Sequence, residues 1–315
     1  MKTFLLRRLL FAVISVIAST MIVFMLSRVQ GDPRYLFLSS GYTSQEQWDA
    51  WGEQMGLDKP LPLQYFVWAG KALKGDFGNS IKSGYTSREM IRLYAPASLQ
   101  LGLAAFLFVI LTGLPLGVLS AVKRGSAWDL IGRAFAVFGQ ALPPFWLGIM
   151  LILIFAVNLE WLPPGQRGGI SHYILPAVTL GWLASAGMMR LVRSSMLEVL
   201  DSEYVKLARA KGVSSKSVVW KHALKNSLIP PLTFSALIMA GFIAGTVVTE
   251  TVFAWPGLGY MTVAAINDND FPVMTTAVMV FTIIYLLTVF CVDLLYGLID
   301  PRIRYSWEIN DNTSK

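Results

Sequence analysis

The stretch that decides the fold runs from Pro96 to Val122 and reads PASLQLGLAAFLFVILTGLPLGVLSAV, with no charged residue. A helix needs about 20 mostly apolar residues to cross the hydrocarbon core of a bilayer. Surface helices of soluble proteins carry charged residues on one face, and this stretch offers no such face. It is therefore predicted to be a membrane-spanning helix.

Five further stretches share this apolar character. They are Leu9–Leu26, Ala134–Leu159, Ser171–Met189, Asn226–Thr249 and Phe271–Val292. Pro143-Pro144 should kink the second of these or break its hydrogen bonding, which a bundle that lines a water-filled path can accommodate. The sequence thus predicts an all-α integral membrane protein with six transmembrane helices.

The composition supports this fold class. Charged residues make up 14% of the chain, against roughly 25% in typical soluble domains, while the AVILMFWYC set makes up 55% and the mean hydropathy is +0.56. These values exclude a collagen, a disordered tail and a small secreted domain held by disulfides. The single cysteine, Cys291, cannot form a disulfide within the chain.

The first apolar stretch has two possible interpretations. Lys2, Arg7 and Arg8 precede it, as basic residues precede the apolar region of a signal peptide. The stretch Leu9–Leu26 is longer than the usual signal-peptide core, however, and Ser27-Arg28-Val29 is a poor cleavage site. We interpret it as an uncleaved anchor.

The basic residues predict the orientation of the spans, because cytoplasmic loops carry an excess of Lys and Arg. With six spans, both termini lie on one side together with loops 123–133 and 190–225. That side holds 17 of the 26 basic and 7 of the 19 acidic residues, and the opposite side holds 9 and 11, with the remaining acidic residue, Asp293, inside a span. The first side is therefore predicted to be cytoplasmic, and the net charge of +7 requires no nucleic-acid partner.

Residues 31–95 form one long segment outside the membrane between the first two spans. Short helices are predicted at Ser44–Met55, with Ser44 as N-cap, and at Leu63–Leu73. The segment is either a small cap that packs on the outer ends of the spans or a docking surface for a soluble partner. Composition alone favours the cap.

The cytoplasmic segment after the fourth span predicts two helices joined by a glycine turn. Glu203–Ala210 is a strong helix former, and Gly212 is placed to end that helix with a positive φ. Ser214 or Ser215 can cap a second helix, Lys216–Asn226, that leads to the next span. Small residues at Ala208, Ala210 and Gly212 leave a slim surface that could enter a groove on another protein.

On the opposite side, the loop Glu250–Tyr260 contains Pro256-Gly257 and then Gly259, which predicts a tight turn. We expect Glu250 to bond turn amides of its own loop rather than a solute. Asp293 is a carboxylate within an apolar stretch, and such residues are candidates for function. Its position near the cytoplasmic end of its span favours a structural pair over a proton relay.

Several kinds of catalytic motif are absent from the sequence. It contains no G-x-x-x-x-G-K-[ST] phosphate loop, no H-E-x-x-H and no G-x-S-x-G elbow. Two histidines and one cysteine make a dedicated metal site unexpected. We therefore expect no catalytic residue, no metal and no cofactor in this chain.

Short motifs occur in a fixed order along the chain. They are Gly31-Asp32-Pro33, Gly56–Leu61 with Gln64-Tyr65 and Trp68, Gly75–Ser80, Glu203–Gly212, His222–Pro230, Glu250–Gly259 and Asp300-Pro301-Arg302. Each motif is weak alone, but together they resemble the permease subunits of bacterial ABC importers in the dipeptide, oligopeptide and nickel branch. The general E-A-A-x-x-x-G pattern of such importers is matched only at Ala208 and Gly212.

The resemblance implies the ABC importer permease fold in a bacterial plasma (inner) membrane, with both termini cytoplasmic. It implies an organisation in which residues 1–30 form the N-terminus and first span, 31–95 the cap, 96–299 a five-span core with coupling loop 194–226, and 300–315 a cytoplasmic tail. The expected partners are a homologous second permease, two ATPase subunits that bind the ATP, an extracytoplasmic solute-binding protein, membrane lipid and a peptide or related small solute.

The resemblance also implies roles for two groups of residues. For the loop that couples to the ATPases these are Glu203, Tyr204, Ala208, Ala210, Lys211, Gly212, His222 and Asn226. For an outer loop or gate they are Glu250, Phe253, Pro256, Gly257 and Gly259.

Two other functions were weighed. A secondary, ion-coupled transporter would use Asp293 to couple an ion, but it would also predict internal repeats and charges at the membrane midplane, which the sequence lacks. An intramembrane enzyme would need a catalytic pair at depth. Among solutes, short peptides are favoured, and nickel chelates, opines and oligosaccharides stay open.

Overall fold

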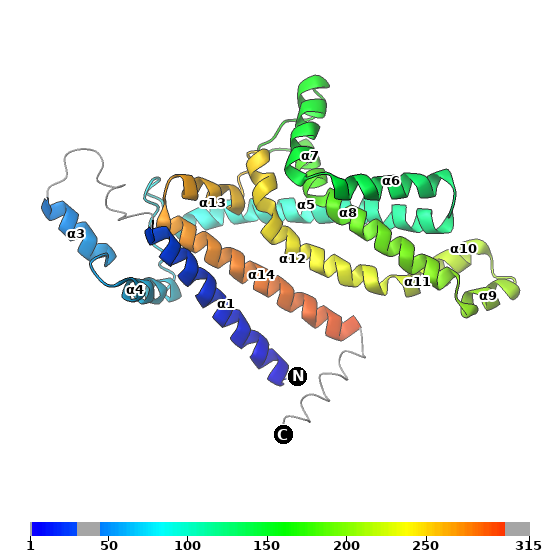
Figure 1. Ribbon diagram of the computed structural model, residues 1–315, viewed down its shortest axis with the longest axis horizontal. Coiled ribbons are helices and arrows are strands. Elements are labelled where there is room, and N and C mark those ends of the chain that lie inside the picture. The colour runs from blue at the N-terminus through cyan, green and yellow to red at the C-terminus, as the bar shows by residue number, and fades with distance from the viewer. Residues whose placement is uncertain (1, 30–44, 300–315) are drawn as a thin grey trace. The chain divides into compact units, whose positions relative to one another are not determined.

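The computed structural model describes residues 2–29 and 45–299, and these residues are mostly helical (Figure 1). The helices are α1 (Lys2–Val29), α3 (Gln45–Met55), α4 (Leu61–Leu73), α5 (Ser87–Val122), α6 (Ala127–Ala141), α7 (Pro144–Leu151), η1 (Ile152–Asn158), α8 (Ser171–Leu200), α9 (Glu203–Ala210), α10 (Ser215–Ser217), η2 (Val218–Ala223), α11 (Leu224–Ser227), α12 (Ile229–Val252), α13 (Leu258–Asn267) and α14 (Phe271–Ile299). Within the described residues there is no β-strand, only an isolated antiparallel bridge between Asn79 and Thr86. The all-α prediction is confirmed.

Four helical stretches are long and apolar enough to cross a membrane. They are Leu9–Leu26, Ser87–Val122, Ser171–Leu200 and Phe271–Cys291. Two bent arrangements raise the number to as many as six: α6 followed by α7 and η1, and α12 with its bend between Phe242 and Thr246. The structure thus has four helices long enough to span a membrane, and it reaches the six predicted spans only if each bent arrangement counts as one span.

The predicted kink at Pro143-Pro144 is a complete break. Helix α6 ends at Ala141, α7 starts at Pro144, and the two helical arms meet at 109°. Figure 1 shows α7 turning away from the direction of α6. Proline lacks an N–H donor and disfavours helical geometry in the residue before it, so neither Pro143 nor Leu142 can extend α6.

Several helices extend beyond the predicted spans. Helix α6 starts at Ala127, so the predicted loop 123–133 is shortened, and α8 continues to Leu200, into the predicted loop 190–225. Helix α5 starts at Ser87 because Thr86 and Glu89 form a reciprocal cap: the Thr86 N–H donates to Glu89 Oε2 (3.0 Å) and the Glu89 N–H to Thr86 Oγ1 (3.2 Å). The apolar pattern predicts the part of a helix that is suited to lipid, whereas the capping residues determine where the helix begins and ends.

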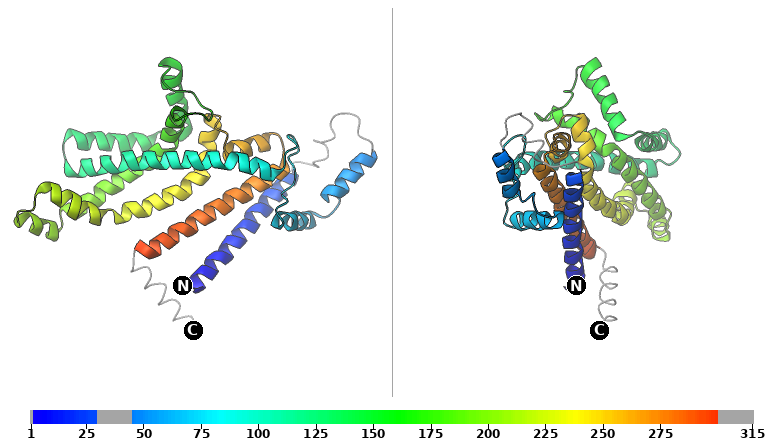
Figure 2. Two further views of the ribbon diagram at one scale, coloured as in Figure 1. Left: turned by 180° about the vertical axis from the view of Figure 1, so that it is seen from behind. Right: turned by 60° about the vertical axis from the view of Figure 1, so that its left-hand side comes forward.

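The chain divides into two compact units, which are described separately. The first unit comprises Met1–Ala97 and Gly257–Leu287. In it α1 and α14 run side by side (Figures 1 and 2), and Ser19 shares a hydrogen bond of 3.2 Å with Thr282. Helix α4 attaches to α1 through the hydroxyls of Thr20 and Tyr65, which are 2.9 Å apart.

A turn at residues 79–86 in this unit is fastened to the start of α14. Asp270 accepts hydrogen bonds from the Ser80 hydroxyl (2.5 Å) and the Ile81 N–H (3.1 Å), and Lys82 pairs with Asp268. Asp270 is 3% exposed. The two helices predicted within 31–95 are present as α3 and α4, although Ser44 lies outside the described residues.

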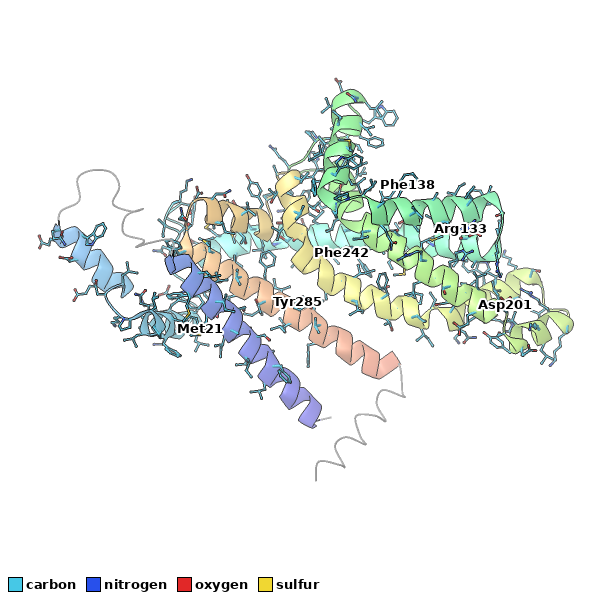
Figure 3. The ribbon with its side chains drawn as sticks, viewed as in Figure 1. Met21, Arg133, Phe138, Asp201, Phe242 and Tyr285 are labelled. Carbon is cyan, nitrogen blue, oxygen red and sulfur yellow. The ribbon has the colours of Figure 1, made fainter. Side chains whose placement is uncertain are left out.

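The second unit comprises Ser98–Pro256 and Thr288–Lys315. Its core lies between α5, α8 and α12 and includes Val109, Met188 and Phe242, the last of which is labelled in Figure 3. A Cβ atom at Gly113 of α5 would lie 2.8 Å from the Ser185 carbonyl oxygen of α8. Small residues therefore allow α5 and α8 to approach closely, as is common between membrane helices.

Candidate functional site

In the segment from α9 to α11, the turn after α9 has the backbone geometry that the sequence predicts. Gly212 has a φ of +80°, its N–H donates to Arg209 O (3.0 Å), and the Val213 N–H donates to Ala208 O (3.2 Å). These two bonds form a Schellman motif, which satisfies the last carbonyls of the helix. The Ser214 hydroxyl then accepts from the Ser217 N–H (3.4 Å), so the predicted second cap is confirmed.

One face of this segment is buried in the core of the second unit. Val205, Val218 and Ala223 are at most 1% exposed, and they share a hydrophobic cluster with Met196 and Leu200 of α8. Asp201, labelled in Figure 3, lies at the junction between α8 and α9. The segment therefore packs on the end of α8 and is not a free linker.

The opposite face presents apolar side chains to solvent. Tyr204 is 44% exposed, Leu207 59% and Trp220 57%. Tyr204 is among the residues predicted for this segment, whereas Leu207 and Trp220 are not. Their exposure could not be read from the sequence, because an apolar residue in a helix is as readily buried as exposed.

Three of the predicted residues meet at the base of this segment. The Asn226 amide donates to Tyr204 Oη (3.0 Å) and to His222 O (2.9 Å), and the Tyr204 hydroxyl donates to His222 O (3.4 Å). These bonds join α9 to η2 and α11. His222 takes part through its main-chain carbonyl.

The remaining predicted residues of this segment lie at the surface. Ala208 is half-buried, and Ala210, Lys211 and Gly212 are exposed. Glu203 forms a surface ion pair of 2.8 Å with Lys206, a type of contact that contributes little stability. A Cβ atom at Gly212 would have no neighbour within 4 Å, so its surroundings are open.

The C-terminal end of α12, at the predicted outer loop, closes with the same pair of hydrogen bonds as the end of α9. The Ala254 N–H donates to Thr251 O (3.3 Å) and the Trp255 N–H to Glu250 O (2.8 Å), while Ala254 adopts a φ of +47°. The predicted location of the turn was wrong: Gly257 is extended (φ −108°, ψ 178°) and caps α13, and the left-handed residue is Ala254. An alanine gives no turn signal in a sequence, which is why its role was missed.

Glu250 is completely buried at this helix end. The Ser98 hydroxyl of α5 donates to Glu250 Oε1 at 2.6 Å. The expected bond to the turn exists, but the main-chain carbonyl of Glu250 makes it with Trp255. The side chain instead connects α12 to α5.

A second loop on the predicted outer side, between η1 and α8, contacts this helix end. The Gln166 N–H donates to Phe253 O (2.8 Å), and a Cβ atom at Gly165 would lie 2.1 Å from that same oxygen. Tyr173 packs edge-on against Trp255, with ring centroids 4.7 Å apart. We call Gly165, Tyr173, Glu250, Phe253 and Trp255 the outer cluster.

The other predicted outer-loop residues follow this cluster in the chain. Pro256 is half-buried, and Gly257 and Gly259 are buried around the first residues of α13. Asp293 falls within α14, but its side chain lies outside the described residues. Asp300-Pro301-Arg302 also lies outside them.

A buried ion pair in the second unit was not predicted. Asp129 of α6 accepts from Arg193 Nε (2.8 Å) and Nη2 (3.1 Å), from the Ser120 hydroxyl (2.5 Å) and from the Gly125 N–H (3.0 Å). Asp129 and Arg193 fall in the predicted loops 123–133 and 190–225, where their charges predict only the orientation of the spans. Within the described residues, no group of three or more His, Cys, Asp or Glu side chains is placed to hold a metal ion.

Comparison with known proteins identifies the family. The model of the binding-protein-dependent transport system inner membrane component matches residues 113–305, and the model of the N-terminal part of such membrane components matches residues 1–83. The chain is 36% identical to the di/tripeptide transport system permease protein DppB of Pseudomonas aeruginosa, covering 97% of this chain and 99% of that protein. It is also 36% identical to the oligopeptide transport system permease protein AppB of Bacillus subtilis, covering 97% and 100%.

A solved structure supports the fold. The inward-facing MetNI methionine ABC transporter contains a chain that superposes with a TM-score of 0.57 at 18% identity, covering 67% of this chain and 96% of that one. With several apolar helices, the protein is a multi-pass membrane protein with the ABC importer permease fold. On these grounds the chain belongs to the family of binding-protein-dependent transport system inner membrane components, the membrane subunits of ABC importers.

Proposed function

We propose that this chain is one of two permease subunits of an ATP-driven importer that takes up short peptides. It crosses the membrane six times, counting the two bent helices, with both termini in the cytoplasm and residues 31–95 outside as a cap. A second, similar permease completes the path, two ATPase subunits bind and hydrolyse ATP, and a binding protein delivers the solute. Relatives named as di/tripeptide and oligopeptide permeases support the choice of solute.

The observation that carries the proposal is the two-faced segment from α9 to α11. Its inner face is anchored to α8 by Val205, Val218 and Ala223, and its outer face exposes Tyr204, Leu207 and Trp220. Three large apolar side chains exposed on one otherwise basic segment suit a docking surface, which would cover them. The ATPase subunit is the partner that such a surface on the cytoplasmic side would contact.

The geometry explains how force would reach the spans. Since α9 packs directly on the end of α8, a displacement of the docked segment moves α8 with it. ATP binding can shift the permease only if the ATPases contact its two states differently. The hydrogen bonds of Asn226 and Tyr204 hold α9 to α11, so the segment moves as one piece.

The coupling role is tested in the complete importer reconstituted with its binding protein. Leu207→Glu places a charge on the exposed docking face and should lower peptide uptake and ATPase association at least tenfold. Leu73→Glu is the control, because Leu73 is also exposed (90%) but lies at the end of α4. Equal uptake and ATPase association in both variants would refute the docking assignment.

The orientation is tested by labelling. After Cys291→Ser, cysteines introduced at Ser83 and Ser214, both exposed, should react oppositely with an impermeant thiol reagent in intact cells. The Ser83→Cys variant should react from outside and the Ser214→Cys variant only after lysis. Labelling of the latter in intact cells would contradict the proposed topology.

A further inference from the structure

The buried ion pair between Asp129 and Arg193 joins three helices at one level. Arg193 belongs to α8, Asp129 to the first turn of α6 and Ser120 to α5, while Gly125 lies in the turn between α5 and α6. We call these four residues the Asp129 clasp. The Asp129 side chain is 3% exposed and that of Arg193 23%.

Each carboxylate oxygen of Asp129 accepts at least two hydrogen bonds within the clasp. Oδ1 accepts from Ser120 Oγ and Arg193 Nε, and Oδ2 accepts from Arg193 Nη2 and the Gly125 N–H. The guanidinium therefore binds in a two-pronged geometry, which fixes direction as well as distance. Arg133, on the exposed side of α6 and labelled in Figure 3, approaches Oδ1 only to 3.7 Å.

This geometry restrains the rotation of α8 about its axis. A purely apolar contact lets two helices slide or turn against each other, whereas two parallel N–H···O bonds hold the guanidinium plane in one orientation. A buried ion pair is weak evidence for stability, because desolvation of the charges offsets their attraction. The Asp129 clasp thus contributes more to the fixed orientation of α8 than to the stability of the protein.

Arg193 lies on the side of α8 that also contacts the segment from α9 to α11, here called the docking segment. Met196 and Leu200 follow it by three and seven residues and so lie on the same side of α8. Both are buried, and they belong to the cluster that receives Val205 and Val218. The clasp therefore fixes the rotation of α8 about its axis, and this rotation determines where the docking segment packs.

We propose that Asp129 and Arg193 are positioning residues for energy coupling. They hold α5, α6 and α8 in one orientation, so that a push on the segment from α9 to α11 moves the three helices together. The proposal rests on the proposed role of that segment. It predicts that loss of the directional bond lowers the amount of peptide transported per ATP hydrolysed, while the complex still assembles.

The test uses the complete importer in proteoliposomes, with binding protein and L-alanyl-L-alanine as the probe. The principal variant is the double substitution Asp129→Leu with Arg193→Met, which removes both charges and keeps an apolar contact. Peptide taken up per ATP hydrolysed should fall at least fivefold, with the yield of complex close to wild type. Lys82→Gln is the control, because it also removes an exposed ion pair, with Asp268, but one that lies in the first unit and outside the docking segment.

A second variant keeps the test decisive if the double variant does not assemble. Arg193→Lys retains the positive charge but cannot form the two-pronged bond, and it should also lower the transport-to-hydrolysis ratio. The swap of Asp129→Arg with Arg193→Asp should restore part of that ratio, since it re-forms a pair. A merely structural clasp would change the yield of complex and leave the ratio unchanged.

The outcomes separate this proposal from the function on which it rests. A wild-type ratio in the assembled double variant, or in Arg193→Lys if the double variant fails, overturns the positioning role alone. If wild-type complex does not take up L-alanyl-L-alanine or longer peptides, the proposed solute class is overturned whatever the variants do. A lowered ratio in both variants, with a normal ratio in Lys82→Gln, supports the positioning role.

Discussion

The two helix ends at Gly212 and Ala254 use the same hydrogen bonds in opposite surroundings. Each places a residue with positive φ after the helix, and each returns two N–H groups to the last turn. Gly212 and Ala254 are both exposed, but a built Cβ atom at Gly212 has no neighbour within 4 Å, whereas Phe253 and Trp255 on either side of Ala254 are at most 1% exposed. The same local motif thus stands free at one helix end and is flanked by packed side chains at the other.

The difference shows which residues determine the conformation of each helix end. At the free end, nothing but the residue itself selects the conformation, so a glycine is needed. At the flanked end, the bond from Gln166 to Phe253 O and the packing of Tyr173 on Trp255 hold the turn, and an alanine can be forced into it. Four substitutions test this contrast, from the largest expected effect to the smallest.

The largest effect is expected at Gly165. A methyl group there would lie 2.1 Å from Phe253 O, and the backbone carbonyl cannot yield without breaking the outer cluster. Gly165→Ala should lower the free energy of unfolding by about 3 kcal/mol or more and sharply reduce the yield of folded protein. The measurement is thermal unfolding in detergent, with Gly169→Ala as control, since a Cβ at Gly169 meets nothing within 4 Å. Equal stability of the two variants would mean that this loop does not hold the helix end.

Glu250→Gln should come next. The side chain is fully buried and accepts the Ser98 hydroxyl, and an amide introduces N–H donors into a site arranged around a carboxylate. We expect a loss of about 1–3 kcal/mol in the free energy of unfolding, with the peptide concentration for half-maximal uptake unchanged. Glu160→Gln, at an exposed position of the neighbouring loop, should be neutral. A stable Glu250→Gln variant that has lost only transport would instead give Glu250 a gating role.

Gly212→Val should reverse the pattern, with a small loss of stability and a large loss of function. The positive φ costs a residue with a Cβ roughly 1–2 kcal/mol, and no steric clash adds to it. We expect uptake to fall at least tenfold, because the bent turn misdirects the docking face. Gly84→Val is the matched control: Gly84 has a φ of +72° and open surroundings but lies in the turn of the first unit. If both variants transport equally, the glycine serves only its own turn.

Ala254→Gly should have the smallest effect. Glycine relieves left-handed strain of roughly 1–2 kcal/mol but adds freedom to the unfolded chain, which costs about 0.4–1 kcal/mol. The two terms largely offset each other, so the free energy of unfolding should change by less than about 1 kcal/mol and should not fall. Ala134→Gly, in the middle of α6, removes no such strain and should cost about 1 kcal/mol. A clear loss of stability in Ala254→Gly would show that the alanine methyl group contributes packing.

These contrasts also explain which features the sequence could predict. The apolar stretches, the glycine turn at Gly212 and the cap at Ser214 depend on near neighbours in the chain, and each was predicted and found. The positive φ of Ala254 depends on a loop whose contact residue, Gln166, is far away in sequence. No local pattern carries that information, so the turn was placed at Pro256-Gly257.

The candidate site shows the same limit of prediction from local sequence. Tyr204, His222 and Asn226 were selected through the family resemblance, and the structure brings them together. The partner of Asp129 is Arg193, 64 residues further on, and each was counted as an ordinary charge. A one-residue change in helix register would separate them, and periodicity cannot fix register between helices that are not adjacent in the chain.

The fastening of Ser80 to Asp270 has a consequence for biosynthesis. The two residues are 190 positions apart, and the first unit consists of an N-terminal part and a part that begins only at Gly257. At ~5–20 residues per second, the ribosome needs roughly 10–40 s to proceed from Ser80 to Asp270. During that interval the newly inserted first span and the turn at residues 79–86 lack their final contacts, so the earliest segment to enter the membrane is among the last to be completed.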